Sequence, residues 1–481
     1  MGIVLLLPIG GFLAIALATV TVRRPWVRRY AGVTAAVVVL ASGLALDVVV
    51  LRGDTVSALG GQLRADALSA FMLSVVGAVG LTATWSGLAP RARPAPTTSY
   101  AVLVVLFLGA MSLGVLADNL GVLWVAVEAT TIATAFLVGH HRTRRSLEAA
   151  WKYVVLGSVG VAIAFLGIVL LYAASRSAGS ATLSWAELST TDLALDPSLV
   201  RLAAALTILG FATKAGLAPM HSWLPDAHSQ APAPVSGLMS GVLLSVAFYA
   251  ILRVQAVAAP VIGTGLMRGM LVTAGLLSLA VATLLLIAQR DLKRMLAYSS
   301  VEHMGVLALA AAIGGRLAIA AALLHVLGHG LAKASSFVSS GWILETEGTT
   351  RLDELGSLLG RRPGITVPFL VGVTALLGLP PFSLFFSEVA IVVAGVREGM
   401  YWVMAATVLL LLAAFAALAR HVVSIAFGAS GSDDPPVPDW SAPGPRFPLG
   451  LALGVTAVAG FVAGPFGTLL TDAAGVLGAT R

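Results

Sequence analysis

The chain has 481 residues, of which 58% are hydrophobic and only 11% are charged. Soluble domains carry about 25% charged residues, so this composition excludes a soluble globular protein and predicts many membrane-spanning helices. Cysteine is absent, which excludes disulfides and cysteine-ligated zinc, haem or iron–sulfur centres. The net charge of +7 comes largely from arginines clustered in short loops, which membrane topology explains without a nucleic-acid partner.

A helix needs about 20 apolar residues to cross a bilayer, and this length predicts about fourteen spans. The fold class is therefore expected to be an all-α polytopic membrane protein. The candidate spans lie near 3–22, 31–51, 66–88, 99–117, 119–139, 150–174, 199–219, 233–256, 262–288, 296–314, 317–343, 364–396, 401–427 and 448–474.

The loops between these spans predict the orientation, because lysine and arginine accumulate in short cytoplasmic loops. Most of them fall on one side of a fourteen-span arrangement, and fewer, including Arg52, Arg64, Arg176 and Arg316, fall on the other. This bias predicts a multi-pass protein of the inner (plasma) membrane with both termini outside the cytoplasm.

Two charged residues stand inside apolar spans. Glu128 lies near the middle of the fifth span, and Lys214 lies in the seventh. A charge at this depth is costly and indicates an ion pathway by default. We expect the two to form an ion pair. A purely structural pair is the alternative, although buried pairs give little net stability over apolar residues.

The seventh span contains a possible break that recurs later in the chain. The sequence from Gly216 to Met220, Gly-Leu-Ala-Pro-Met, returns from Gly378 to Phe382 as Gly-Leu-Pro-Pro-Phe in the twelfth span. Five helices separate the two, so they cross the membrane in opposite directions. Inverted units with discontinuous helices are a transporter architecture. The alternative is chance, because glycine and proline are frequent in membrane helices.

Polar residues follow the seventh-span break and enter the tenth span. His221, Asp226 and His228 are candidates to cap a cytoplasmic funnel, or else they satisfy backbone groups freed by the nearby prolines. Glu302 and His303 lie at least one turn inside the tenth span and are candidates for a proton path. The preceding Lys293 and Arg294 are interpreted as topology anchors.

The eleventh span carries His325, His329 and Lys333 at spacing i, i+4, i+8. Successive members are displaced by about 40° and 6 Å, so all three share one helix face. This geometry favours a proton relay. A metal site also uses histidines at i, i+4, but it usually requires a third ligand. A nearby lysine would also repel a bound cation. Histidines bonded to backbone groups remain a third possibility.

Glu388 follows the break in the twelfth span as the acidic counterpart of the charged seventh span. Because Glu388 lies several residues after the prolines, it is also possible to interpret it as an ordinary residue at the membrane surface. The chain contains no P-loop, no glycine-rich dinucleotide turn and no nucleophile constellation. We therefore expect no bond chemistry, no metal and no cofactor in this chain.

Two long motifs resemble a known family. Residues 214–237 read Lys-Ala-Gly-Leu-Ala-Pro-Met-His-Ser-Trp-Leu-Pro-Asp-Ala-His-Ser-Gln-Ala-Pro-Ala-Pro-Val-Ser-Gly, and residues 291–305 read Asp-Leu-Lys-Arg-Met-Leu-Ala-Tyr-Ser-Ser-Val-Glu-His-Met-Gly. Both are similar to signatures of the antiporter-like proton-pumping subunits of respiratory complex I, Mrp-type antiporters and group 4 hydrogenases. The Val-Glu-His variant looks most like the hydrogenase-4 component F branch. The resemblance covers about 100–428.

The resemblance implies fourteen helices with two inverted five-helix repeats and discontinuous helices 7 and 12. The corresponding parts of the chain are an N-terminal three-helix segment (1–98), a first repeat (99–256), a second repeat (257–428), and a loop with helix 14 (429–481).

The resemblance also assigns roles to four charged residues. The likeness matches Glu128 to the family's charged position on its fifth helix and Lys214 to that on its seventh. It matches Lys333 to the position on the eleventh helix and Glu388 to that on the twelfth. Ser245 stands where complex I members usually have a helix 8 lysine, which puts the link between the half-channels in doubt.

The predicted function is proton translocation within a membrane oxidoreductase, together with other membrane subunits and a peripheral redox arm. In the expected cycle, Glu128 stabilises charged Lys214, a redox-driven change weakens that pair, and the proton moves along the central polar row to Lys333 and Glu388. Three alternatives remain: a sodium/proton antiporter of the Mrp type, a structural anchor with a vestigial channel, and coupling to CO₂ or bicarbonate uptake.

Overall fold

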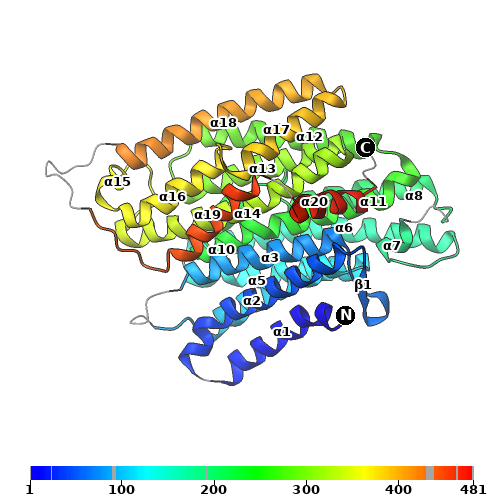
Figure 1. The fold of residues 1–481 in the computed structure, drawn as a ribbon, viewed down its shortest axis with the longest axis horizontal. Helices are drawn as coiled ribbons and strands as arrows, with labels where there is room; N and C mark the ends of the chain where they lie inside the picture. Colours follow the sequence, from blue (N-terminus) through cyan, green and yellow to red (C-terminus); the bar gives the residue numbers. More distant parts are fainter. Residues whose placement is uncertain are drawn as a thin grey trace.

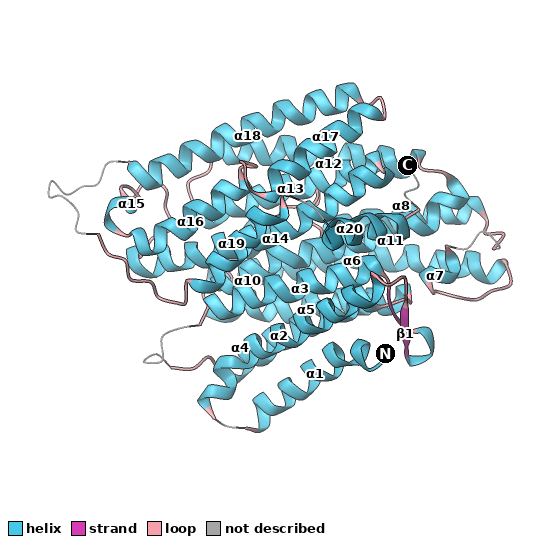
Figure 2. Ribbon diagram, viewed as in Figure 1, coloured by secondary structure: helices cyan, strands magenta, loops and turns pink. Residues whose placement is uncertain are grey.

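The computed structural model describes residues 2–22, 24–88, 94–189, 193–428, 438–461 and 464–478. They form a bundle of helices whose axes run in broadly one direction, with α1 at one edge and α18 at the opposite edge (Figure 1). One small antiparallel hairpin, β1 with β2, is the only sheet among the described residues (Figure 2).

The elements follow one another as follows. They are α1 (Gly2–Thr21), α2 (Pro25–Val50), β1 (Val56–Ala58), η1 (Leu59–Gly61), β2 (Leu63–Ala65), α3 (Ala67–Ser86), α4 (Thr98–Leu116), α5 (Leu120–Val138), η2 (Gly139–His141), α6 (Arg144–Ser177), α7 (Trp185–Leu188), α8 (Pro197–Lys214), α9 (Trp223–Gln230), α10 (Ala233–Leu238), the π-helical turn η3 (Met239–Leu243), α11 (Leu244–Ile262), α12 (Gly265–Ile287), α13 (Leu292–Ile313), α14 (Gly315–Glu347), α15 (Leu358–Arg361), α16 (Pro363–Leu376), α17 (Ser383–Arg397), α18 (Tyr401–Phe427), α19 (Phe447–Ala459) and α20 (Gly464–Val476).

Short polar side chains set where several helices begin. The Asn119 side chain accepts hydrogen bonds from two backbone N–H groups of α5, and Asp196 does the same for α8. Asp66 caps α3, and Asp291 caps α13. Each cap satisfies backbone donors that have no partner inside the helix, which matters most where water is scarce.

The all-α membrane fold is confirmed, but the count of fourteen spans is not. Among the described residues, eleven helices are long and apolar enough to cross a bilayer, or twelve if the bent pair α19 and α20 is one span. The three remaining expected spans are interrupted. The seventh stops at Lys214, the twelfth is split into α16 and α17, and α19 and α20 differ in direction by 77°.

The two predicted helix breaks are confirmed, and each contains a glycine that its backbone requires. Gly216 has φ +75° and Gly378 has φ +62°, a left-handed conformation that favours glycine. A Cβ on Gly216 would also lie 2.4 Å from a Leu224 side-chain carbon. The repeated Gly-Leu-x-Pro sequence therefore marks two structurally similar interruptions. The boundaries of the proposed repeats stay a prediction.

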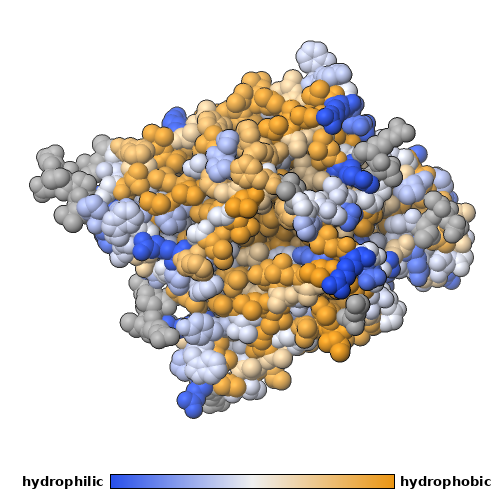
Figure 3. All heavy atoms as spheres, in the orientation of Figure 1, coloured by the Kyte–Doolittle hydropathy of each residue, from blue (hydrophilic) through white to orange (hydrophobic). Residues whose placement is uncertain are grey.

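The most buried helices are the ones that carry ionisable groups. The apolar windows of α10–α11 and α13 are wholly buried, whereas that of α1 is mostly exposed. The face of the molecule shown in Figure 3 is dominated by apolar side chains, with hydrophilic residues gathered mainly toward the ends of the bundle. An apolar exterior around a charged interior suits a lipid-embedded protein with an internal polar path.

A buried ion pair joins the N-terminal segment to the central helices. Arg253 on α11 donates from Nη2 to Asp66 Oδ1 at 2.8 Å, and both side chains are almost fully buried. The Arg253 guanidinium also lies 3.8 Å from the Trp185 ring centroid and donates to Tyr249 OH at 2.9 Å. The sequence analysis did not single out this pair.

We expect Asp66→Asn to lower the melting temperature of the detergent-solubilised chain, because Arg253 would then be buried without a counter-ion. Breaking a buried pair in this way costs about 3–5 kcal/mol. Asp353→Asn is the matched control, since its pair with Arg351 is exposed and should change the melting temperature little. Equal melting temperatures for wild type and Asp66→Asn would contradict a structural role for the pair.

Candidate functional site

Ionisable side chains from six helices gather inside the bundle. Lys214, His228, His325, His329 and Lys333 are fully buried, and Glu302 and His303 are nearly so. They come from α8, α9, α13 and α14, while α5 contributes Glu128 and α17 contributes Glu388. The structure therefore brings the predicted charged positions to neighbouring helices.

Lys214 ends α8 and is surrounded by hydroxyl groups. Its Nζ donates to Thr131 Oγ1 at 2.8 Å and to Tyr153 OH at 2.6 Å. The same Nζ lies 4.6 Å from the Tyr153 ring centroid, a distance at which the ring face attracts a cation. The Tyr153 hydroxyl lies 2.5 Å from Thr134 Oγ1. Thr131 and Tyr153 therefore both accept hydrogen bonds from the buried ammonium.

The predicted direct ion pair between Glu128 and Lys214 is wrong in this structure. Glu128 accepts hydrogen bonds from Thr131 Oγ1 at 3.2 Å and from Ser158 Oγ at 2.8 Å. Thr131 stands three residues after Glu128 on the same face of α5, so its hydroxyl lies between the carboxylate and Lys214. It accepts from the ammonium and donates to the carboxylate.

Aromatic side chains continue from Tyr153 toward α14. The Tyr153 ring lies 5.0 Å from the Trp223 ring. Trp223 Nε1 donates to Thr213 O across the break between α8 and α9. Trp223 neighbours His228, which stacks 5.4 Å from Phe337 of α14. Neither ring nitrogen of His228 has a hydrogen-bond partner among the described residues. Buried nitrogens of this kind ordinarily bind ordered water, so we expect a water molecule beside His228.

Lys333 of α14 has a similar set of contacts. Its Nζ donates to Leu296 O at 2.7 Å and to the Ser299 hydroxyl, both on α13. Glu302 follows Ser299 by three residues and so lies on the same face of α13. As at Lys214, a hydroxyl group contacts the ammonium, and the nearest acidic residue of the helix stands one turn away.

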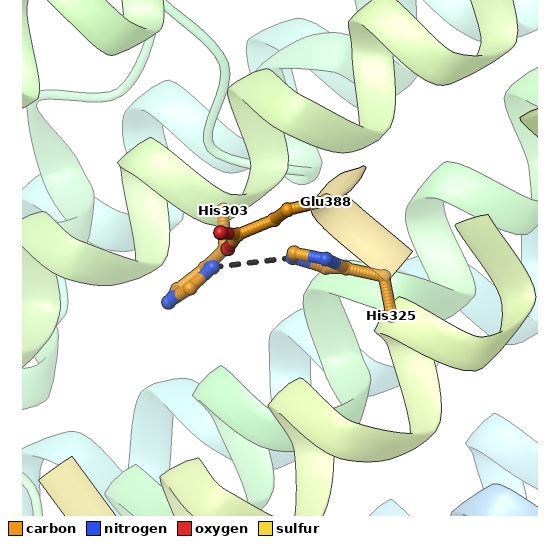
Figure 4. A group of neighbouring side chains, drawn as sticks. All are labelled: His303, His325 and Glu388. Atoms are coloured by element: carbon orange, nitrogen blue, oxygen red, sulfur yellow. Dashed lines mark hydrogen bonds between the residues drawn. The ribbon is translucent and has the colours of Figure 1, made fainter. Parts of the chain in front are cut away.

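A cluster of imidazoles and a carboxylate lies beyond Lys333 (Figure 4). His303 Nδ1 is 3.1 Å from His325 Nε2, and His325 Nδ1 is 3.0 Å from Ser387 Oγ. The His329 ring stacks 6.4 Å from His325 and lies 5.1 Å from His303. The i, i+4 row on α14 is therefore joined by His303 from α13, which spacing along one helix did not reveal.

Glu388 belongs to this cluster and is not an exposed interfacial residue. Glu388 is only partly buried, but its Oε2 would be 2.5 Å from a Cβ on Gly378. Its side chain therefore folds back against the break between α16 and α17. Ligand atoms of His303, His325 and Glu388 all lie within 4.8 Å of one another. This position resolves the question that the sequence left open.

Ser245 of α11 stands at the position where the resemblance leads us to expect a lysine. It is buried, and its Oγ has no hydrogen-bond partner among the described residues. It follows the π-helical turn Met239–Leu243, a feature often found at functional sites. Within that turn Ser240 Oγ lies 2.7 Å from Ser300 Oγ of α13. Hydroxyl groups, and no lysine, therefore occupy this junction.

Basic residues of α13 and α6 clamp α9, the short helix after the first break. Asp226 Oδ1 accepts from Arg294 at 2.9 Å, and its Oδ2 accepts from Lys152 at 3.2 Å. Lys293 Nζ donates to Ala231 O at 2.6 Å and Ser229 O at 3.0 Å, at the end of α9. Lys293 and Arg294 therefore also hold α9 in place. This corrects the interpretation of the sequence, in which they were topology anchors.

His221, which precedes α9, is partly exposed, and its Nδ1 is a buried nitrogen without a hydrogen-bond partner in the described residues. His221 is not among the residues that contact Asp226, which are Lys152 and Arg294. The structure therefore does not bring His221, Asp226 and His228 into one shared set of contacts. Sequence reasoning missed several contact residues, namely Thr131, Tyr153, Ser158, Ser299 and Ser387. Only the position of Thr131, one turn from Glu128, signalled its place.

The chain matches known proteins over most of its length. Residues 117–413 match the family model described as NADH:quinone oxidoreductase/Mrp antiporter, TM. A hydrogenase-4 component F homolog from Methylacidiphilum infernorum is 39% identical over 68% of this chain and 69% of its own length. Subunit N of NADH-quinone oxidoreductase from Desulforudis audaxviator is 34% identical over 77% and 75%.

Solved structures agree with these relatives. A chain of the archaeal membrane-bound sulfane sulfur reductase superposes with a TM-score of 0.86 at 25% identity, over 99% of this chain and 98% of that chain. A chain of respiratory complex I from Thermus thermophilus gives 0.77 at 25% identity, over 98% and 99%. A chain of the Mrp complex from Dietzia sp. DQ12-45-1b shares the fold, with a TM-score of 0.83 at 21% identity over 100% and 97%. The chain therefore belongs to the NADH:quinone oxidoreductase/Mrp antiporter transmembrane family, as a multi-pass, antiporter-like membrane subunit.

Proposed function

We propose that this chain translocates protons within a membrane-bound oxidoreductase complex and couples electron transfer in partner subunits to proton transport. The observation that carries the proposal is the site of Lys214, which is fully buried and, among the described residues, is hydrogen-bonded to the hydroxyls of Thr131 and Tyr153. The names of the relatives, hydrogenase-4 component F homolog and NADH-quinone oxidoreductase subunit N, support the same class of complex.

The hydroxyl groups around Lys214 suit both protonation states of its amine. When the amine is charged, Thr131 accepts from it and donates to Glu128, while Tyr153 accepts from it and donates to Thr134. A hydroxyl rotates and can act as donor or acceptor. After proton loss either hydroxyl can donate to the neutral amine. Lys214 therefore keeps hydrogen-bond partners throughout a cycle of proton loss and gain.

The released proton would pass through the buried histidines to the second half. His228 lies between the Lys214 site and α14, and His329, His303 and His325 follow beyond Lys333. A neutral imidazole has one donor and one acceptor nitrogen, so it can take a proton on one side and release it on the other. Water beside the partnerless nitrogens and Ser245 would complete the steps, and Glu388 would receive the proton.

Movement of α9 is the proposed coupling element. This helix is held by Arg294 and Lys293 of α13 and by Lys152 of α6, while its Trp223 bonds the backbone of α8 one residue before Lys214. A shift of α9 would therefore change the surroundings of Lys214 directly. One elementary charge crossing 100 mV requires about 2.3 kcal/mol, which a change in one or two buried hydrogen bonds to a charged group can supply.

The proposed setting combines the class of complex that the relatives' names indicate with the distribution of lysine and arginine between the loops. The chain would lie in the inner (plasma) membrane with both termini outside the cytoplasm, against other membrane subunits and a peripheral redox arm. The electron carriers would belong to that arm, so this chain would need no metal or cofactor for its own role and would contact no nucleic acid.

Lys214→Met in the assembled complex, reconstituted in vesicles, should abolish most proton transport, because no other group can carry the proton at this position. We expect at least about a tenfold loss in the initial rate of pH-gradient formation, measured with a fluorescent dye. Arg316→Met, at an exposed site, is the matched control. Full proton pumping at normal redox turnover in Lys214→Met would refute the assignment, and a gradient that depends on sodium would instead support an Mrp-type antiporter.

Thr131→Val removes the hydroxyl between Glu128 and Lys214 while keeping the side-chain shape. Hydrogen bonds to charged groups contribute about 1.5–3 kcal/mol, so the proton-transport rate should fall by about tenfold or more. Thr84→Val serves as the control, because the Thr84 hydroxyl bonds only its own helix at Gly80 O. If Thr131→Val pumps like wild type while Glu128→Gln does not, the carboxylate acts on Lys214 without the hydroxyl.

A further inference from the structure

We propose that His303, His325 and Glu388 form a binding site for a zinc-class divalent transition-metal ion. The three side chains come from α13, α14 and α17, and one ligand atom from each lies within 4.8 Å of the others (Figure 4). This binding goes beyond the proposed transport function and does not require it, because it depends only on the positions and chemistry of the three ligands.

The spacing of the two imidazoles already approaches that of a metal centre. His303 Nδ1 and His325 Nε2 are 3.1 Å apart. With Zn–N bonds of about 2.0–2.1 Å, two nitrogens on a tetrahedral zinc ion are about 3.3 Å apart. A metal ion replacing the hydrogen bond between the rings would therefore need only a small separation of the two rings. The Glu388 carboxylate would move the rest of the way by side-chain rotation.

The ligand types indicate the class of metal. Two imidazoles and one carboxylate form a three-ligand set used for zinc, with a fourth position open to water. Imidazole nitrogens suit zinc, copper, nickel and cobalt, whereas magnesium and calcium require oxygen ligands. The chain has no cysteine, so no thiolate elsewhere in it competes for such an ion.

The structure answers the first objection that the sequence raised against a metal, and it shows which groups Lys333 contacts. The i, i+4 pair His325 and His329 had no third ligand, but His303 and Glu388 from other helices complete a set around His325. Lys333 was expected to repel a cation. Its Nζ is bonded to Leu296 O and the Ser299 hydroxyl of α13, and it makes no hydrogen bond to any of the three ligands.

A second observation comes from the outer partner of His325. Its Nδ1 lies 3.0 Å from Ser387 Oγ, which leaves Nε2 directed at His303. Histidines that bind metals typically have their other nitrogen held in this way, which fixes the ring orientation. Ser387 is fully buried and also bonds Leu384 O, so the orientation of the His325 ring is set before any ion binds.

Binding would compete with protons and would block the histidine relay. The metal needs neutral imidazoles and an ionised carboxylate, so its affinity should rise with pH as protons are removed. A bound ion would also displace the hydrogen bond between His303 and His325. Inhibition of transport by zinc rests on the proposed function, whereas the binding itself does not.

The test uses the full chain without a histidine tag, purified in detergent and titrated with Co²⁺, and then with Zn²⁺ as competitor. We expect one high-affinity ion per chain, visible absorption bands of four-coordinate Co²⁺, and tighter binding at pH 8 than at pH 6. His325→Ala and Glu388→Gln should each weaken binding by at least tenfold. Ser387→Ala, which retains all three ligands, should weaken it by about 10–100-fold, as loss of an outer partner does.

The adjacent His140 and His141 provide the control, because they form a close imidazole pair outside the cluster of His303, His325 and His329. The double variant His140→Ala/His141→Ala should keep the high-affinity site. The proposal is overturned if no stoichiometric binding occurs, if binding survives in folded His325→Ala and Glu388→Gln proteins, or if it is lost in the double variant. Proton transport by the metal-free complex would test the proposed function separately.

Discussion

The arrangement depends on how an apolar helix bundle stabilises a buried lysine without giving it a direct counter-ion. Lys214 is fully buried, and its Nζ is bonded to two hydroxyl groups. A carboxylate in contact would hold the ammonium charged at all times. One hydroxyl between them keeps Glu128 close enough to attract the charge, while leaving the amine free to lose its proton.

The use of lysine and arginine follows the same distinction. The chain has four lysines among its 29 basic residues, and three of them, Lys214, Lys293 and Lys333, are buried. Arginine stays protonated in proteins, whereas a buried lysine can lose its proton. Arg253, the one arginine that is almost wholly buried in the described part of the chain, contacts Asp66 directly. The permanent charge therefore has a direct counter-ion, and the two proposed switching charges are bonded to hydroxyl and carbonyl groups.

The sequence predicted what depends on one helix at a time. Composition and apolar length gave the membrane fold, and Gly216 and Gly378 marked both helix breaks. The spacing on α14 placed His325, His329 and Lys333 on one face. It could not show which residues of other helices lie opposite. The hydrogen bond from Lys214 to Thr131, the contact of His303 with His325, and the clamp on Asp226 all depend on tertiary packing. The count of fourteen failed because a uniform length criterion does not fit interrupted spans.

The most direct measurement of the central claim is nitrogen NMR of lysine side chains in the assembled complex. Selective ¹⁵N-lysine labelling of this chain gives four Nζ signals, and single substitutions assign them. The account predicts that the Lys214 signal changes between ammonium and amine forms when the redox state of the complex is switched. The Lys152 signal should stay ammonium, because its partners are the carboxylates of Glu148 and Asp226. A Lys214 signal that remains ammonium in every redox state would contradict the account.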